Sequence, residues 1–218
     1  HGASKTSAIQ DVSSQGQAVM VAEFLDALEI EAVDLVGNDG GGAVAQLFAV
    51  AHPERVRSLV LTNCDAHDNW PPEAFKGFVE MCAQGGLRST LQAMMADKAV
   101  YRSAGALGPC YERPDLVSDE TIEAYLAPHL KSPERLRDLE RFVAAFDNEL
   151  TVAIEPQLKN LEVSTLVVWG DDDVYFDAKW GRWLKDTVPG AERLVELKGA
   201  RLFFPEERPG EFNEQLRL

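Results

Sequence analysis

Cysteine is scarce in this sequence, with only Cys64, Cys82 and Cys110 among 218 residues. These three residues are far apart and odd in number, which argues against a disulfide framework and against a cysteine-held metal cluster. Long apolar runs are also missing, since none approaches the roughly 20 residues that a membrane-spanning helix needs. The first seven residues are small and polar, so we expect no signal peptide and a cytoplasmic protein.

Basic residues are outnumbered, with 21 Lys and Arg against 36 Asp and Glu and a formal net charge of −15. A surface of that sign repels phosphate backbones and anionic lipids, so we expect neither nucleic acid nor a membrane as a partner. We expect a small-molecule substrate or ligand, and a homo-oligomer is left open. Apolar residues make up 45% of the chain, which is enough for the core of one compact domain.

Short apolar runs indicate an α/β sheet. Two such runs, residues 33–36 and 59–62, flank a helix predicted over residues 43–52. That order is a βαβ unit, which implies parallel strands and a right-handed crossover. Strand patterns return later in the chain, at residues 166–169 and 193–197.

Helical spacing replaces the strand patterns in the middle of the chain, where glycines and prolines separate short helices. We therefore predict a parallel sheet with helices on both faces, interrupted by a helical cap. The predicted division is an α/β part in residues 1–69, the cap in residues 70–158 and a second α/β part in residues 159–218.

A glycine-rich turn, Gly37-Asn38-Asp39-Gly40-Gly41, joins the first predicted strand to the next helix. Its form is Gly-x-Asp-x-Gly, a turn so tight that the residues two before and two after the centre must be nearly free of side chains. The turn lifts the central side chain above the sheet and aims the next backbone N–H at the reacting centre. We expect Asp39 at positive φ, with its carboxylate facing a pocket beneath the cap.

Two other interpretations of this turn compete. A dinucleotide-binding loop needs glycine where Asp39 stands, and an anion beside a pyrophosphate is unfavourable. A plain glycine-rich turn is the second alternative. For Asp39 itself, a structural aspartate at a helix N-terminus is left open.

Together with residues 52–61 and 167–173, the turn resembles the nucleophile elbow of the α/β-hydrolase fold family. The resemblance implies that Asp39 stands where most relatives carry a nucleophilic serine, and that the Gly40 N–H is an oxyanion donor. Carboxylates at this position are typical of epoxide hydrolases and haloalkane dehalogenases. Such a carboxylate displaces a leaving group from an sp³ carbon and leaves an ester, which water then hydrolyses. Asp173, three residues after Gly170, takes the place of the acid that orients a histidine.

The expected catalytic histidine is replaced. Residues 199–209 resemble the family's last motif, and a gapless alignment puts Leu202 in the histidine position. Leucine cannot accept a proton, so we expect Leu202 or Arg201 above Asp173, where Arg201 could pair with the carboxylate. His67, in the loop after the second predicted strand, is the candidate substitute base, with an ordinary polar loop as the alternative.

Other family features are incomplete. Dehalogenases commonly have a halide-holding tryptophan directly after the nucleophile, where this chain has Gly40. Epoxide hydrolases use cap tyrosines to protonate the opening ring, but the spacing of Tyr101, Tyr111 and Tyr125 selects no pair. Residues 1–4 look like the end of a loop that follows the family's fourth strand. The resemblance therefore implies that the first four strands are absent and that the elbow strand has an exposed edge.

The sequence thus predicts a hydrolase for a small, fairly apolar substrate, such as an epoxide, a haloalkane or an ester-like compound. Asp39 would be the nucleophile, Asp173 the acid and His67 the base, with no metal and no organic cofactor. The alternative is a catalytically impaired relative that binds a small ligand in the same pocket. Leu202 favours this alternative, whereas the retained Asp39 and Asp173 argue against it.

Overall fold

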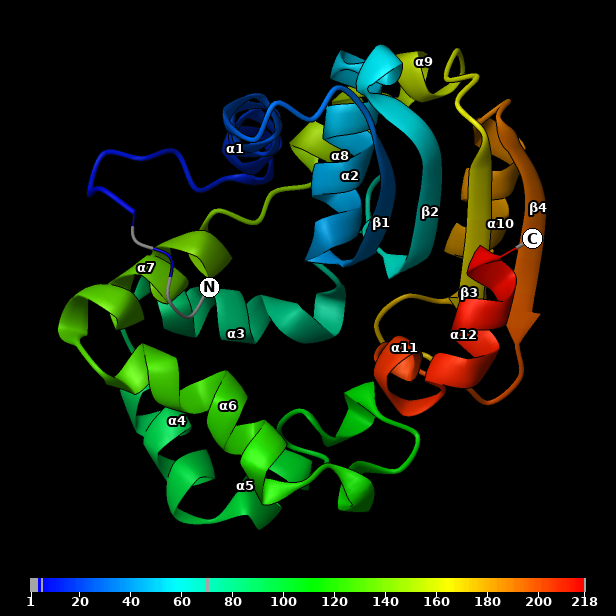
Figure 1. Cartoon of the computed structure of the whole chain (residues 1–218). Helices are drawn as coiled ribbons and strands as arrows, with labels where there is room; N and C mark the ends of the chain where they lie inside the picture. Colours follow the sequence, from blue (N-terminus) through cyan, green and yellow to red (C-terminus); the bar gives the residue numbers. More distant parts are fainter. Residues whose placement is uncertain (1–3, 5, 70, 218) are drawn as a thin grey trace.

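A parallel sheet forms the centre of the molecule, a computed structural model that describes residues 4, 6–69 and 71–217 (Figure 1). The strands pair in the order β1-β2-β3-β4, and every pair is parallel. The predicted fold class, a parallel sheet with helices on both faces, is confirmed. The strands are β1 (Val33–Asp39), β2 (Val56–Cys64), β3 (Thr165–Gly170) and β4 (Ala191–Leu197).

Helices cover both faces of this sheet because successive strand residues point to opposite sides. Leu61 and Trp169 are buried on the face covered by α2 (Gly40–Ala51) and α10 (Ala178–Thr187). Val60 and Val168 are buried on the other face, which packs against α11 and α12. The remaining elements of these two layers are α1 (Ser14–Ala27), η1 (Pro53–Arg55), α11 (Phe204–Glu207) and α12 (Pro209–Leu216).

A helical segment separates β2 from β3, and the carboxyl ends of the strands point toward it (Figure 1). The predicted division of the chain stays a prediction, and Trp70, where the cap was expected to begin, lies outside the described residues. The helices of this segment are η2 (Glu73–Phe75), α3 (Lys76–Ala83), α4 (Leu87–Ala96), α5 (Lys98–Arg102), η3 (Gly108–Cys110), η4 (Pro114–Leu116), α6 (Asp119–Leu130), α7 (Pro133–Ala144), α8 (Glu149–Ala153) and α9 (Glu155–Leu158).

β1 lies at one edge of the sheet, with β2 as its neighbour. Val36 on this strand is exposed. The resemblance at residues 1–4 falls on positions that, apart from Ser4, lie outside the described residues. None of the described helices is long and apolar enough to cross a lipid bilayer.

Candidate active site

Asp39 lies at the junction where β1 ends and α2 begins at Gly40. Its backbone angles are φ 54° and ψ −136°, so the expected positive φ is confirmed. A non-glycine residue in such a conformation costs of order 1–3 kcal/mol, which the surrounding structure must offset. The neighbouring strand helps, because the Asp65 N–H donates to the Asp39 carbonyl at 3.4 Å.

The glycines around Asp39 differ in how much space a side chain would have at each position. A Cβ at Gly37 would lie 2.8 Å from the Ala45 Cβ, so this position must be glycine, as expected. The second expected position, Gly41, has nothing within 4 Å among the described residues. Gly42 is the crowded one, because its Cβ would lie 2.2 Å from the Cys64 Cβ. Close contact between α2 and the end of β2 therefore depends on a glycine one residue later than the motif predicts.

The Asp39 side chain lies at a small apolar cavity of about 80 Å³. Among the described lining residues, only Asp39, Cys110 and Tyr175 carry a polar side-chain atom. Part of the wall comes from the helical segment, as expected for a pocket beneath a cap. The complete lining is Asp39, Pro72, Phe75, Leu107, Cys110, Tyr175, Phe176, Leu202 and Phe203.

Burial in this apolar setting raises the pKa of Asp39 to about 6, and the nearby Asp173 carboxylate adds to the rise. The Gly40 backbone N–H, next to the Asp39 carboxylate, lowers the pKa and partly offsets both effects. The structure thus brings together three of the predicted site residues, Asp39, Gly40 and Asp173. At neutral pH the Asp39 carboxylate is ionised yet poorly solvated, which is the state of a reactive nucleophile.

Asn63 holds Asp173 in place. Its Nδ2 donates to Asp173 Oδ2 at 2.7 Å, and the backbone N–H of Tyr175 donates to Oδ1 at 2.8 Å. Burial nevertheless raises the pKa of Asp173 above its usual value. Asn63 also exchanges two hydrogen bonds with Gly170, since its Nδ2 donates to the carbonyl at 3.1 Å and its Oδ1 accepts from the N–H at 2.6 Å. The motif comparison did not select Asn63.

Leu202 is buried and lines the Asp39 cavity, so an isobutyl group occupies this side of the site. Asn38 fixes the segment, because its Nδ2 donates to the Leu202 carbonyl at 3.1 Å. Leu202 and Arg201 were the two alternatives for the space above Asp173, and the pairing of Arg201 with that carboxylate is not observed. The guanidinium instead lies 2.9 Å from Asp172, whose carboxylate is more exposed.

His67 contacts residues that do not line the Asp39 cavity. Its Nε2 is 2.9 Å from Glu155 Oε2, and its ring lies 5.0 Å from Trp183 and 6.3 Å from Trp180, centroid to centroid. His67 is not among the residues that line the Asp39 cavity. The structure therefore does not bring His67 together with Asp39, and its role as base gains no support from these contacts.

Sequence reasoning also missed the surroundings of three tyrosines and a buried acid. Tyr175 and Cys110 both line the Asp39 cavity, whereas Tyr101 and Tyr111 pair with each other, 3.1 Å between hydroxyl oxygens. Asp65 is fully buried, and neither carboxylate oxygen has a hydrogen-bond partner among the described residues. Burial and the Asp39 charge raise the pKa of Asp65 well above its usual value.

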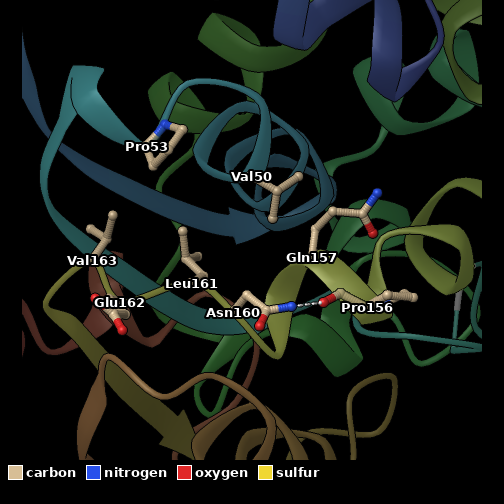
Figure 2. A pocket seen from close by; sticks show the side chains of 8 residues that line it. All are labelled: Val50, Pro53, Pro156, Gln157, Asn160, Leu161, Glu162 and Val163. Atoms are coloured by element: carbon tan, nitrogen blue, oxygen red, sulfur yellow. Dashed lines mark hydrogen bonds between the residues drawn. The ribbon is translucent and has the colours of Figure 1, made fainter.

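A larger groove of about 750 Å³ lies away from this site, between the end of α2 and the segment around α9 (Figure 2). Val50, Pro53, Pro156 and Leu161 contribute to its lining, and no nucleophile lies beside a base there. No cluster of three His, Cys, Asp or Glu side chains able to hold a metal occurs in the part of the chain that the structure describes. The Asp39 cavity is therefore the candidate active site.

Comparison with known proteins agrees with this fold. The sequence model of the alpha/beta hydrolase fold family matches residues 1–208. A 2-hydroxy-6-oxo-6-phenylhexa-2,4-dienoate hydrolase of Burkholderia cepacia is 27% identical over 185 residues, which cover 80% of this chain and 58% of the relative. A 2-hydroxymuconate semialdehyde hydrolase of Pseudomonas sp. (strain CF600) is 68% identical over 37 residues, 17% of this chain and 13% of the relative. The chain thus spans less than two thirds of the length of these relatives.

Among solved structures, Est816, described as an N-acyl homoserine lactone degrading enzyme, superposes with a TM-score of 0.69 at 29% identity. The match covers 100% of this chain and 78% of that one. The epoxide hydrolase CorEH superposes with a TM-score of 0.74 at 19% identity, covering 99% of this chain and 76% of that one. That likeness shows the fold alone, so the predicted aspartate-nucleophile branch stays a prediction.

Proposed function

Because this chain belongs to the alpha/beta hydrolase fold family, we propose that it is part of a hydrolase for a small, mostly apolar substrate with Asp39 as nucleophile. The observation that carries the proposal is the Asp39 carboxylate, which sits in a strained junction at an apolar cavity. The names of the hydrolase relatives, whose substrates carry hydrocarbon chains or rings, support the same class of substrate.

In the first step, an Asp39 oxygen attacks a saturated carbon of the substrate. The bond from that carbon to its leaving group breaks, the leaving group takes the electron pair, and an ester of Asp39 remains. Poor solvation favours this step, because the attacking carboxylate gives up little hydration. Asp173 keeps Asp39 basic through charge repulsion, which raises the pKa of Asp39.

In the second step, water adds to the ester carbonyl of Asp39 and an oxyanion develops on the Asp39 side chain itself. The Gly40 backbone N–H already lowers the pKa of this carboxylate, so it is the natural donor for that charge. The step also needs a group that takes a proton from water. Leu202 supplies none, and we propose that the second step is slower than the first.

Leu202 favours a second candidate function, a ligand-binding relative with an impaired second step. The two functions make different predictions for Asp39→Asn. If the protein is a hydrolase, product formation from epoxides, haloalkanes or esters is lost in this variant. If it is a ligand-binding relative, the binding of the same compounds persists in this variant. We would measure both with a panel of such compounds, using Gly41→Ala as a matched control because an added Cβ there meets no described atom within 4 Å. Product formation that survives in Asp39→Asn would contradict the hydrolase proposal.

A further inference from the structure

One short stretch of the helical segment is fastened to the end of the sheet over the candidate site. We call residues 107–113 the strap and residues 201–208 the clamp. The Phe203 N–H donates to the Cys110 carbonyl at 3.0 Å. Arg201 donates to the Tyr111 carbonyl at 3.3 Å, and the Tyr111 ring meets the Phe203 ring edge to face at 5.2 Å.

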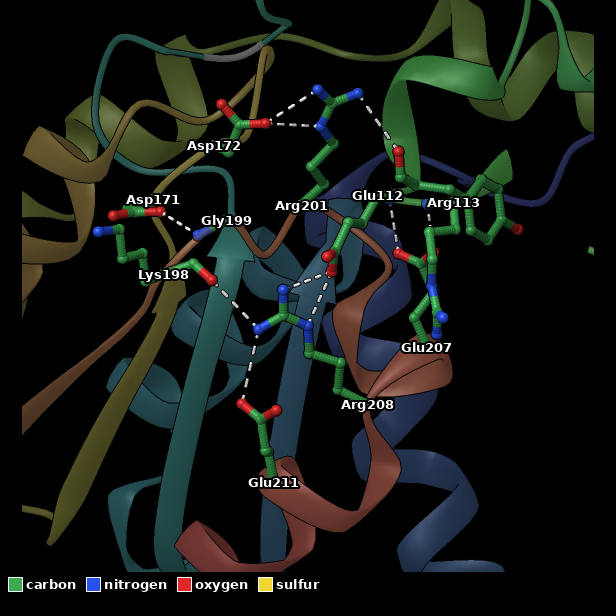
Figure 3. A network of polar contacts seen from close by, with 11 residues as sticks. Glu112, Arg113, Asp171, Asp172, Lys198, Gly199, Arg201, Glu207, Arg208 and Glu211 are labelled. Atoms are coloured by element: carbon green, nitrogen blue, oxygen red, sulfur yellow. Dashed lines mark hydrogen bonds and ion pairs between the residues drawn. The ribbon is translucent and has the colours of Figure 1, made fainter. Parts of the chain in front are cut away.

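Charged groups hold the next two strap residues (Figure 3). The Glu207 carboxylate accepts from the N–H of Glu112 at 2.8 Å and from the N–H of Arg113 at 2.9 Å. Arg208 donates through Nε to Glu112 Oε2 at 2.8 Å, and a second guanidinium nitrogen contacts the same oxygen. All four consecutive residues from Cys110 to Arg113 are therefore bound to the clamp, in a region with no strand pairing between the two segments.

The fastened segments form two walls of the Asp39 cavity. Leu107 and Cys110 belong to the strap, while Leu202 and Phe203 belong to the clamp. With both in place, the cavity measures about 80 Å³, far below the roughly 300–1,000 Å³ of ordinary small-molecule pockets. While these walls stay in contact, the space beside Asp39 holds only a few heavy atoms.

We propose that the strap is a gate whose release from Glu207 and Arg208 admits ligands to Asp39 and so determines the size of molecules that the site accepts. The ion pair between Arg208 and Glu112 is partly open to water, since the Arg208 side chain is 20% exposed and that of Glu112 is 38% exposed. Salt screens partly exposed ion pairs, so the gate opens more often at high ionic strength. The inference goes beyond the proposed function, because it holds whether or not Asp39 turns over a substrate.

Cys110 reports directly on opening, because its thiol lies in the cavity wall and is almost fully buried. Cys64 and Cys82 are also buried but lie outside the strap and provide internal controls. Each thiol reacts with iodoacetamide only when its surroundings open, and peptide mass spectrometry separates the three rates. Arg208→Gln removes the ion pair to the strap, and we expect Cys110 to react about tenfold faster while the other two rates stay unchanged.

Glu211→Gln is the matched control, since Glu211 contacts Arg208 at 3.6 Å but does not touch the strap. We expect no change at Cys110 in that variant, and in the unmodified protein we expect salt to accelerate Cys110 alone. If Arg208→Gln does not fold, Glu112→Gln removes the same pair from the strap side and must have the same effect. An unchanged Cys110 rate, or equal acceleration of all three cysteines, would overturn the proposal.

Discussion

Asn63→Ala tests how the candidate site is held together. Asn63 is fully buried and makes three side-chain hydrogen bonds, two with the Gly170 backbone and one with Asp173. Alanine leaves the Gly170 N–H and carbonyl without partners, and each such buried group costs about 1–3 kcal/mol. Asn63 also has φ 28°, a region that asparagine tolerates better than alanine. We therefore expect the free energy of unfolding to fall by about 3–5 kcal/mol.

Urea unfolding followed by tryptophan fluorescence measures this loss. Asn69→Ala is the control, because Asn69 donates one hydrogen bond, to the Tyr175 carbonyl at 3.2 Å, and its loss should cost about 1 kcal/mol. A loss for Asn63→Ala that is no larger than the loss for Asn69→Ala would refute the reasoning that Asn63 joins β2, β3 and the acid loop.

Three further predictions concern Asp39 and its surroundings. Because the pKa of Asp39 is raised to about 6 from 3.8, ionising this carboxyl costs the folded state up to about 3 kcal/mol above pH 6, and the cost vanishes as the pH falls below 3.8. Asp39→Asn should therefore stabilise the protein at pH ~8 and have little effect at pH ~4, measured by urea unfolding at both values. Leu202→His places an imidazole at the cavity. If the imidazole acts as a base, we expect the Asp39 ester, which accumulates in the unmodified protein, to be hydrolysed about 10²–10⁴-fold faster in this variant. An unchanged rate of ester hydrolysis would show that the imidazole does not act as a base. Gly42→Ala should destabilise the protein by about 1–3 kcal/mol because its Cβ would collide with Cys64, whereas Gly41→Ala should be neutral or stabilising by up to about 1 kcal/mol; equal melting temperatures for the two variants would contradict this difference.

The sheet and the elbow could be predicted because their signals are local. The short pattern Val33-Asp34-Leu35-Val36 was enough to locate β1, and Gly37 and Asp39 mark the turn that follows it. The positive φ of Asp39 follows from the same short motif. Even here the motif misplaced one constraint, since the crowded glycine is Gly42, whose neighbour Cys64 comes from the next strand.

The contacts that complete the site could not be predicted, because they join residues far apart in the sequence. Asn63 and Asp173 are separated by 110 positions, and no local pattern ties an asparagine at a strand end to a distant carboxylate. A pairing of Arg201 with Asp173 was one alternative, but Arg201 pairs with the adjacent and more exposed Asp172. His67 was selected for its place after β2, but side-chain direction decided its contacts with Glu155.

The central claim is that the Asp39 carboxylate attacks substrate carbon, and a covalent ester on Asp39 is its direct product. We would incubate the protein with a small epoxide or a small alkyl bromide, stop the reaction in acid and locate the added mass by peptide mass spectrometry. The account predicts an adduct on the peptide containing Asp39, formed faster as the pH rises through about 6 and absent in Asp39→Asn. No adduct at any pH, or one that persists in Asp39→Asn, would contradict it.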